Sequence, residues 1–302
     1  MNKKKFVIID GHALIYRGYY AVPPLRTQKG ELVNAVFGFT TVLLNMLQKV
    51  KPDYLAVAFD LKGPTFRHDA YDGYKATRSA TPDDLLPQVP RVKQVARAFQ
   101  IPIFEQEGFE ADDMIATIST KLKAYSDIEY LIVTGDMDLT QLVSEQVKLL
   151  SPLSGFNNVK TYDVAAVIEK FGVRPDQMID FKALMGDTSD NIIGVPGIGK
   201  VTATKLLQQY ETLDGIYEHI EETKGAVKTK LEAGKEAAYQ SQHLVQLIHD
   251  VELELDLEAC HTHEVDGQQV RLLFGELEFR RLITKFDELH QGWQITQQPA
   301  LF

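Results

Sequence analysis

The segment Lys5–Asp10 reads KFVIID, a short continuous apolar run that ends in an acid. Such a run is typical of a strand buried on both faces within a parallel sheet. The pattern returns in YLAVAFD at Tyr54–Asp60 and in YLIVT at Tyr130–Thr134, which Gly135 and Asp136 follow. Alternation with helical segments predicts an α/β domain, in which helices cover both faces of a parallel sheet. We expect weaker strands at Ile101–Phe104 and Val147–Leu150, and helices at residues 34–50, 87–99 and 109–125.

The strand signal fades after Thr161, and helical segments joined by Gly and Pro take over. We therefore predict the α/β domain over residues 1–160 and a helical region over residues 161–290. Residues 291–302 read QGWQITQQPALF and are expected to form a linker or tail.

The composition is that of an ordinary globular protein, with 44% hydrophobic and 25% charged residues among 302. No apolar run approaches the roughly 18 residues of a membrane span, so no membrane partner is expected. Cys260 is the only cysteine in the sequence, which excludes an internal disulfide and fits a reducing cytoplasm. The net charge of −10 neither requires nor excludes a nucleic-acid partner, because binding depends on local clusters of charge.

Acids follow the three strongest strands, at Asp10, Asp60 and Asp136. The carboxyl ends of parallel strands share one edge of the sheet, where ligands bind, so these acids should converge. A single acid in such a place is more often a solvated loop residue or a helix cap. Converging carboxylates repel one another, and hard cations such as Mg²⁺ relieve that repulsion. Further candidates are Glu110, Asp112 and Asp113 at a helix start, Asp138, and the pair Asp187 and Asp190.

The segment Gly186–Lys205, GDTSDNIIGVPGIGKVTATK, contains a glycine-rich turn that leads into a helix. Gly194, Gly199 and Lys200 have the spacing of a phosphate-binding P-loop. However, Val201 stands where that loop has Ser or Thr, and no apolar strand precedes it. A helix-hairpin-helix, which holds a nucleic-acid backbone through amide groups, describes the segment better. A helical hairpin without function is the alternative.

The segment after Asp60 is polar, basic and aromatic. Cations neutralise phosphates and aromatic rings stack on bases, so this composition suits a single nucleic-acid strand. A solvated surface loop is the alternative. The cations are Lys62, Arg67, Lys75 and Arg78, and the aromatic residues are Phe66, Tyr71 and Tyr74.

Six motifs in this order, IIDGHALIYR, FRHDAYDGYKATR, EADD, TGDMD, GDTSDN and GVPGIGKVTATKLL, give the chain a family resemblance. From Phe6 to about Leu289 it resembles the 5′-nuclease (flap endonuclease) domain of bacterial DNA polymerase I and its stand-alone relatives. The resemblance implies a PIN-like α/β fold, a helical arch at about residues 62–85, and a helix-hairpin-helix at about residues 176–210. That hairpin is expected to bind K⁺ and duplex DNA.

The resemblance also implies roles for individual residues. Two or more Mg²⁺ ions, which Mn²⁺ could replace, are expected to bind at two sites. One departure from the family is Val201, which stands where a lysine is usual, and another is Met137, where a basic residue is frequent. The expected ligands are Asp10, Asp60, Glu110, Asp112 and Asp113 for the first site and Asp136, Asp138, Asp187 and Asp190 for the second. Tyr74, Lys75 and Arg78 are expected to engage the scissile phosphate, with Arg17 lining the active site. The expected DNA contacts of the turn are Gly194, Gly197, Gly199, Lys200, Thr202 and Lys205.

These expectations describe a 5′-3′ exonuclease and 5′-flap endonuclease that leaves a 5′ phosphate and a 3′ hydroxyl by two-metal hydrolysis. Such an enzyme suits primer removal and lagging-strand processing. Expected partners are branched or 5′-ended DNA and a polymerase, fused or separate; the chain is expected to act as a monomer and not to polymerise DNA itself.

Two alternatives remain at this stage. The Asp-x-Asp of residues 136–138 suits a small-molecule phosphatase, but Gly11 and His12 follow Asp10 with no second acid two positions on. Such an enzyme also needs no basic, aromatic segment. The other alternative is a DNA-binding module without catalysis.

Overall fold

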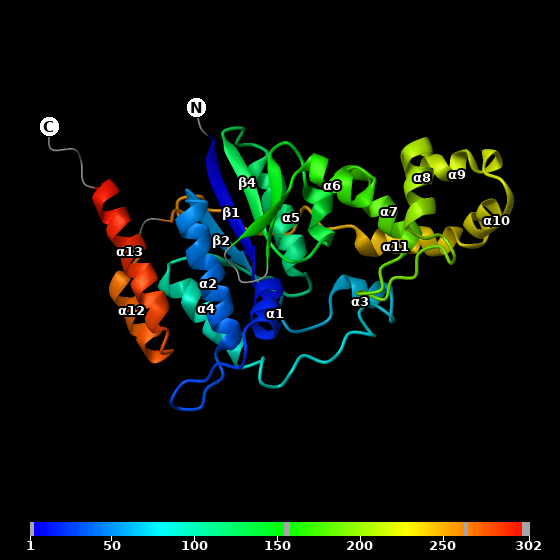
Figure 1. Ribbon diagram of the computed structural model, residues 1–302. Helices are drawn as coiled ribbons and strands as arrows, with labels where there is room; N and C mark the ends of the chain where they lie inside the picture. The colour runs from blue at the N-terminus through cyan, green and yellow to red at the C-terminus, as the bar shows by residue number, and fades with distance from the viewer. Residues whose placement is uncertain (1–2, 154–157, 263–264, 298–302) are drawn as a thin grey trace.

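The computed structural model describes residues 3–153, 158–262 and 265–297. A six-stranded sheet forms its centre, in the order β3-β2-β1-β4-β5-β6 (Figure 1). Every neighbouring pair is parallel except β5 and β6. The strands are β1 (Lys4–Asp10), β2 (Tyr54–Ala58), β3 (Ile103–Phe104), β4 (Ile128–Val133), β5 (Val147–Pro152) and β6 (Val159–Tyr162).

Strand β1 lies between β2 and β4, and Phe6 is in register with Tyr54 on one side and Tyr130 on the other. The chain first builds the sheet outward from β1 to β2 and β3, and then returns to add β4 on the opposite side of β1. Such a reversal of strand order opens a crevice at the carboxyl edge of a parallel sheet. The ends of β1, β2 and β4 meet at this edge.

One face of the sheet is covered by α1 (Gly11–Ala21), α2 (Asn34–Lys49) and α4 (Gln88–Ala98). Helix α1 starts directly at the end of β1, where the Asp10 carboxylate caps it by accepting from Ala13 N at 3.0 Å. Gly18 and Gly38 let α1 and α2 pack closely, since a Cβ on Gly38 would lie 2.5 Å from Gly18 Cα. The other face carries α5 (Ala111–Leu122) and the first C-terminal helices.

Helices α6 to α11 extend from the sheet to one end of the molecule (Figure 1). Helix α11 packs along α7, and α8 to α10 lie at the end away from α12 and α13 (Figure 1). The helices are α6 (Val164–Phe171), α7 (Met178–Met185), α8 (Lys200–Tyr210), α9 (Leu213–Glu218), α10 (Gly225–Ala233), α11 (Lys235–Val245), α12 (Gly267–Glu276) and α13 (Arg280–Gln297). Short 3₁₀ turns are η1 (Asp138–Leu142), η2 (Pro175–Gln177) and η3 (Ile220–Glu222).

After α11 the chain returns to the α/β part, where Leu55 N donates to Cys260 O at 2.8 Å. Helices α12 and α13 then pack against α4 and α2. Strand β6 crosses the boundary predicted at residue 160, and residues 291–297 of the predicted tail continue α13; residues 298–302 lie outside the described residues. Within the described part of the chain, no helix is both long and apolar enough to cross a membrane.

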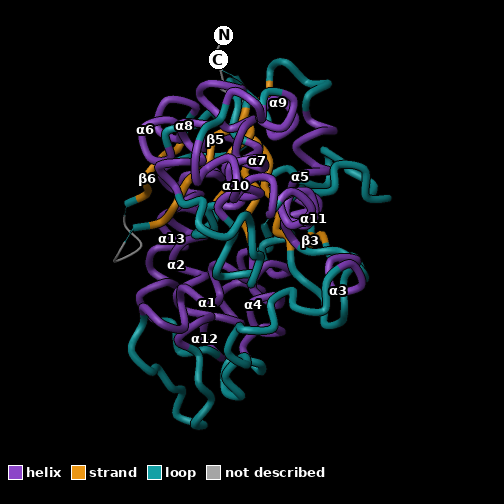
Figure 2. Tube along the Cα trace, turned by 90° about the vertical axis from the view of Figure 1, so that its right-hand side faces the viewer, coloured by secondary structure: helices purple, strands orange, loops and turns teal. Residues whose placement is uncertain are grey.

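The predicted strands and helices are all present, with ends that shift by a few residues. The arch segment, residues 62–85, differs from the expected helical arch because its only helix is α3 (Phe66–Ala70). The rest is turns and irregular chain that folds back on the C-terminal helices. Tyr74 packs with Ile192, Leu244 and Val245 in a small buried cluster, and α3 lies beside α11 (Figures 1 and 2).

Candidate active site

A cleft of about 230 Å³ opens at the carboxyl edge of the sheet, where the strand-end acids were predicted to converge. Its other walls include His12, Tyr16, Lys75 and Arg78. Two larger hollows of about 550 Å³ each lie elsewhere, one lined by residues 121–125 and 252–255 and one between α2 and α13, and neither contains a comparable set of acids. Seven of the nine predicted metal ligands line the cleft, namely Asp10, Asp60, Glu110, Asp112, Asp136, Asp138 and Asp190.

Asp10 is the most deeply placed of the strand-end acids, with 4% of its surface exposed. Its Oδ2 accepts the hydroxyl of Thr134 at 2.7 Å, and its Oδ1 caps α1. Burial raises the pKa of Asp10 to about 7, and the charges of Asp60 and Asp136 act in the same direction. The charged groups that act on Asp10 are therefore other carboxylates.

Asp112 and Asp138 show the same effect. Burial, followed by the charge of Asp136, raises the pKa of Asp112 well above its usual range. Burial and the same neighbour raise the pKa of Asp138 to about 7, against the opposing charge of Lys182. Bound cations would favour the ionised form of all these groups, so the electrostatics of the cleft suit hard divalent ions.

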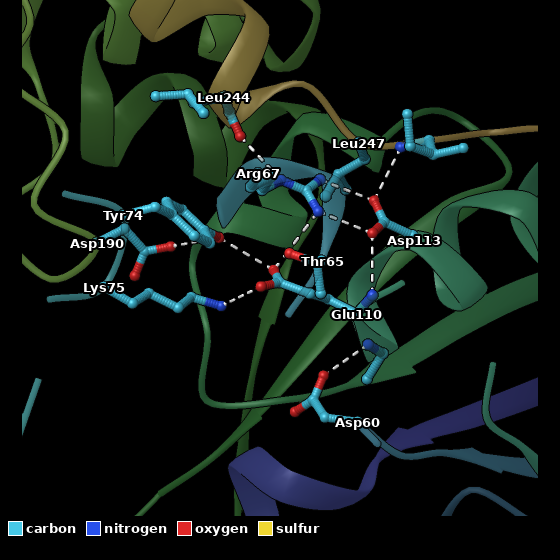
Figure 3. A network of polar contacts seen from close by, with 12 residues as sticks. Asp60, Thr65, Arg67, Tyr74, Lys75, Glu110, Asp113, Asp190, Leu244 and Leu247 are labelled. Atoms are coloured by element: carbon cyan, nitrogen blue, oxygen red, sulfur yellow. Dashed lines mark hydrogen bonds and ion pairs between the residues drawn. The ribbon is translucent and has the colours of Figure 1, made fainter. Parts of the chain in front are cut away.

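Cations of the chain itself neutralise part of the acid cluster. Lys75 Nζ donates to Glu110 Oε1 at 2.6 Å, and Arg78 Nη2 donates to Asp190 Oδ1 at 2.5 Å. The Tyr74 hydroxyl lies 3.1 Å from an oxygen of each of these two carboxylates (Figure 3). Basic residues of the arch segment thus contact acids at the cleft, as a phosphate-binding group beside a metal site would.

Lys182 performs the same role on the other side of the cleft. Its side chain is 11% exposed, and its ammonium donates both to Asp138 and, at 2.7 Å, to Asp187 Oδ2. Burial acts against ionisation of Asp187, but Lys182 and the bonds from Ser189 lower its pKa to about 2. Asp187 does not line the cleft itself, and is joined to it through this shared lysine.

The predicted role of Asp113 is wrong. Its carboxylate is 0% exposed and forms a bidentate ion pair with Arg67, with both N···O distances at 2.8 Å (Figure 3). It also accepts from the amides of Glu110 and Ile248. The expectation for Arg67 is wrong for the same reason, because a guanidinium that is 2% exposed cannot contact a nucleic-acid backbone.

The donor chemistry of the cleft fits divalent cations, since carboxylate oxygens are the ligands that Mg²⁺ prefers. In the part of the chain that the structure describes, no three acidic, His or Cys side chains converge on one point as a finished metal site would require. The ion pairs with Lys75, Arg78 and Lys182 direct three of the cleft carboxylates, those of Glu110, Asp190 and Asp138, toward cations of the chain.

Three residues that contribute to the site were not predicted from the sequence. Thr134 and His12 each bond a strand-end residue: Thr134 holds Asp10, and His12 Nδ1 accepts from Asp60 N at 3.0 Å. Lys182 was the most visible of the three, as a lone cation within the apolar helix MIDFKALM. Conversely, Arg17 is half-buried on α1, one turn beyond Ala13, and is not among the side chains of the cleft wall.

The glycine-rich turn joins α7 and α8 as predicted, and its residues divide into buried and exposed ones. Gly194 is buried at φ +65°, and its amide donates to Ser241 Oγ, so its predicted DNA contact is wrong. Gly197 and Gly199 are exposed, and Gly199 precedes the first turn of α8. Lys200 is exposed but donates to Lys170 O at 2.7 Å. Thr202 is partly exposed and Lys205 is exposed on α8.

The mostly parallel sheet, its helices on both faces and the cleft at its carboxyl edge define a PIN-like α/β fold. Solved structures share this fold. The T5 5′-exonuclease, described with bound divalent metal ions (zinc), has a TM-score of 0.66 at 21% identity, over 80% of this chain and 89% of that one. The catalytic core of Rad2 in complex with DNA substrate has a TM-score of 0.60 at 16% identity, over 97% and 93%.

The chain belongs to the 5′-3′ exonuclease family. Residues 5–172 match the N-terminal, resolvase-like domain of that family, and residues 173–268 match its C-terminal SAM fold. The DNA polymerase I of Chloroflexus aurantiacus is 42% identical over 97% of this chain, and that of Caldicellulosiruptor bescii is 41% identical over 93%. The chain spans about a third of the length of these relatives, 32% and 33%. The predicted family, the α/β fold and the class of enzyme are confirmed.

Proposed function

We propose that this chain hydrolyses phosphodiester bonds of DNA at 5′ flaps and 5′ ends and leaves a 5′ phosphate and a 3′ hydroxyl. The observation that carries the proposal is the cleft itself, where seven carboxylates lie beside Lys75 and Arg78. Acids alone would suit many metal enzymes. Acids next to basic side chains suit a phosphate substrate, because metal ions held by the acids and the basic side chains can both bind the phosphate oxygens.

The cleft would hold two Mg²⁺ ions, with Mn²⁺ as a substitute. Asp10, Asp60, Glu110 and Asp112 would hold the first ion. Asp136, Asp138 and Asp190, with Asp187 adjacent, would hold the second. Bound at such sites, divalent ions supply Lewis acidity, a more acidic water and neutralisation of the leaving oxygen.

The residues of the arch segment would orient the substrate. Lys75 and Arg78 already extend to the cleft, and each would exchange a carboxylate for the scissile phosphate once divalent ions occupy Glu110 and Asp190. There they would stabilise negative charge that develops on the phosphate during displacement. Tyr74 is buried, with 4% exposure, and would hold in place the stretch of backbone that carries Lys75 and Arg78.

The exposed part of the turn would anchor the duplex part of the substrate. The N-terminal end of α8, where backbone amides attract phosphate oxygens, is formed by Gly197, Gly199, Lys200 and Thr202, and Lys205 is exposed farther along the helix. K⁺ would bind at the same turn. The Gly197 carbonyl attracts a cation there, because it accepts from Lys230 Nζ at 3.1 Å, and K⁺ would compete with that ammonium.

In a cell this activity would remove RNA primers and process lagging-strand fragments, together with a polymerase that is fused or separate. We place the chain in the cytoplasm as a monomer. Support comes from the polymerase I relatives and from the single cysteine, Cys260, which is buried.

One incubation tests the proposal. A flap substrate labelled at its 5′ end is incubated with the protein and Mg²⁺, with Mn²⁺, or with a chelator. We expect release of the flap with either metal and none with the chelator, and ligation of the product by DNA ligase would verify the 5′ phosphate. A protein that binds the flap but never cuts it would be a binding module, and one that removes only a terminal phosphate would be a phosphatase.

A further inference from the structure

Arg67 and Asp113 form a buried ion pair that the proposed mechanism does not use. Arg67 lies on α3 in the arch segment, and Asp113 lies in the first turn of α5. Their side chains are 2% and 0% exposed. Each guanidinium nitrogen of the fork donates to one carboxylate oxygen at 2.8 Å, a planar geometry that only arginine offers (Figure 3).

The remaining bonds of the pair reach a third segment. Arg67 Nε donates to Leu244 O at 2.9 Å, and Nη2 donates to Gln246 O at 3.0 Å. Asp113 Oδ1 accepts from Ile248 N at 2.9 Å. The pair therefore connects the start of the arch segment, the start of α5 and the chain that leaves α11.

The same pair lies directly behind the cleft. Asp113 Oδ2 accepts from Glu110 N at 3.1 Å, which fixes the backbone of a residue that lines the cleft. Arg67 Nη1 also lies 3.6 Å from Glu110 Oε2. Glu110 in turn bonds Lys75 and Tyr74 of the arch segment (Figure 3). A displacement of Arg67 would thus move both an acid and a cation of the proposed site.

Stability alone gives a weak reason for this arrangement. A buried ion pair loses the hydration of both charges, and apolar residues of similar volume are often equally stabilising in its place. Apolar residues cannot supply directional hydrogen bonds. The N–H groups of arginine lie in one plane, so their bonds determine where the three segments lie relative to one another.

We propose that Arg67 is a positioning residue that acts through Asp113: the pair holds Glu110 and the arch segment so that Lys75 faces the scissile phosphate. The inference rests on the proposed nuclease function and deepens it. It also gives Asp113 a role behind the metal site in place of a role in it.

Two variants test the proposal against a structural role. Arg67→Lys keeps the charge and loses the fork. The double variant Arg67→Met with Asp113→Leu removes both charges, so that neither is left buried alone. We expect both variants to fold, with a lower melting temperature because backbone groups bonded by the pair lose a partner, and to bind a flap in chelator with unchanged Kd. The kcat for flap cleavage should fall about 10²-fold in each at unchanged KM, as a small misplacement of reacting groups predicts.

Arg91→Lys is the matched control. Arg91 on α4 also makes a two-bond fork, with Glu31, through Nε at 2.6 Å and Nη2 at 3.0 Å, and is not among the residues that line the cleft. We expect it to retain wild-type kcat. The midpoint of Mg²⁺ activation should rise in the two Arg67 variants and stay constant in the control, because only the former displace Glu110.

Three results would overturn the inference. The first is a double variant with wild-type kcat, which would show that Arg67 serves only to neutralise the charge of Asp113. The second is an Arg67→Lys variant that does not fold, which would make Arg67 a folding residue. The third is a loss of DNA affinity equal to the loss of rate. Wild-type protein that fails to cut the flap in the same assay would instead refute the proposed function.

Discussion

The ammonium of Lys75 lies 2.6 Å from a carboxylate oxygen of Glu110, so a residue expected to act on the phosphate contacts one expected to hold a metal ion. The two residues come from two different sequence motifs, Lys75 from the arch segment and Glu110 from the EADD motif at the start of α5. Their contact is the direct evidence that the arch segment belongs to the acid-lined cleft. It also suggests which variants separate catalysis from folding.

Lys75→Ala should lower kcat for flap cleavage by about 10²-fold, because it removes a charge that stabilises the phosphate during displacement. Flap binding measured in chelator should change little. Lys148→Ala is the control, since Lys148 makes an equal 2.6 Å bond with Glu129 at the amino end of the sheet. Equal rates for Lys75→Ala and Lys148→Ala would remove Lys75 from the mechanism.

Asp136→Asn should abolish Mg²⁺-dependent cleavage while the fold is retained. Asp136 Oδ1 accepts from Asp138 N at 2.8 Å, and an asparagine keeps this acceptor while it removes the charge. We expect a loss of rate of at least about 10²-fold. Asp163→Asn is the control: Asp163 caps α6 through a 2.9 Å bond from Ala166 N and lies outside the cleft wall. Cleavage at the wild-type rate by Asp136→Asn would contradict the assignment of the second metal site.

Lys182→Met should destabilise the protein by about 2 kcal/mol, because Asp138 and Asp187 lose their shared cation. The figure is below that for a fully buried pair, since these carboxylates keep 25% and 11% exposure. Mg²⁺ should restore more of the melting temperature in Lys182→Met than in wild type, because it neutralises the same acids. Lys148→Met should cost less than about 1 kcal/mol and gain nothing from Mg²⁺ beyond the wild-type shift. An equal response of all three proteins to Mg²⁺ would argue against metal binding near Asp138.

Gly199→Leu should weaken binding to the duplex part of a flap by about tenfold, equivalent to about 1.4 kcal/mol. Gly199 has φ −102° and open space around its Cα, so the fold accepts a side chain, whereas a close DNA backbone would not. Gly275→Leu on α12, with equally open surroundings, serves as the control. The two affinities are compared by fluorescence anisotropy in chelator. If Gly199→Leu binds as tightly as Gly275→Leu, the turn is not the anchor.

Much of the fold was predictable because apolar runs that end in acids are local signals. Asp10, Asp60 and Asp136 were placed at one edge by a general property of parallel sheets, and all three line the cleft. The arch segment was harder to predict. Its shape depends on the packing of Tyr74 with Leu244 and Val245. These residues are far apart in the sequence, so their contacts leave no periodic pattern in it.

Two adjacent acids show most clearly what the sequence alone could not predict. Asp112 lines the cleft and Asp113 is buried against Arg67, although both follow Glu110 in one EADD motif. Successive residues of a helix point about 100° apart, so the side chains of Asp112 and Asp113 leave α5 in different directions. Which of them faces the metal depends on how α5 is rotated against the sheet, and packing sets that rotation.

The strands and the acids at their ends were readable from the sequence because each is encoded within a few consecutive residues, and the family was readable from short motifs in a fixed order. Three features required the folded chain: which carboxylates face the cleft, which cations neutralise them and where the arch segment lies. These depend on contacts such as Arg67 with Asp113 and Lys182 with Asp138, between residues 46 and 44 positions apart. Such pairs form only when burial and hydrogen bonding across several elements are satisfied together.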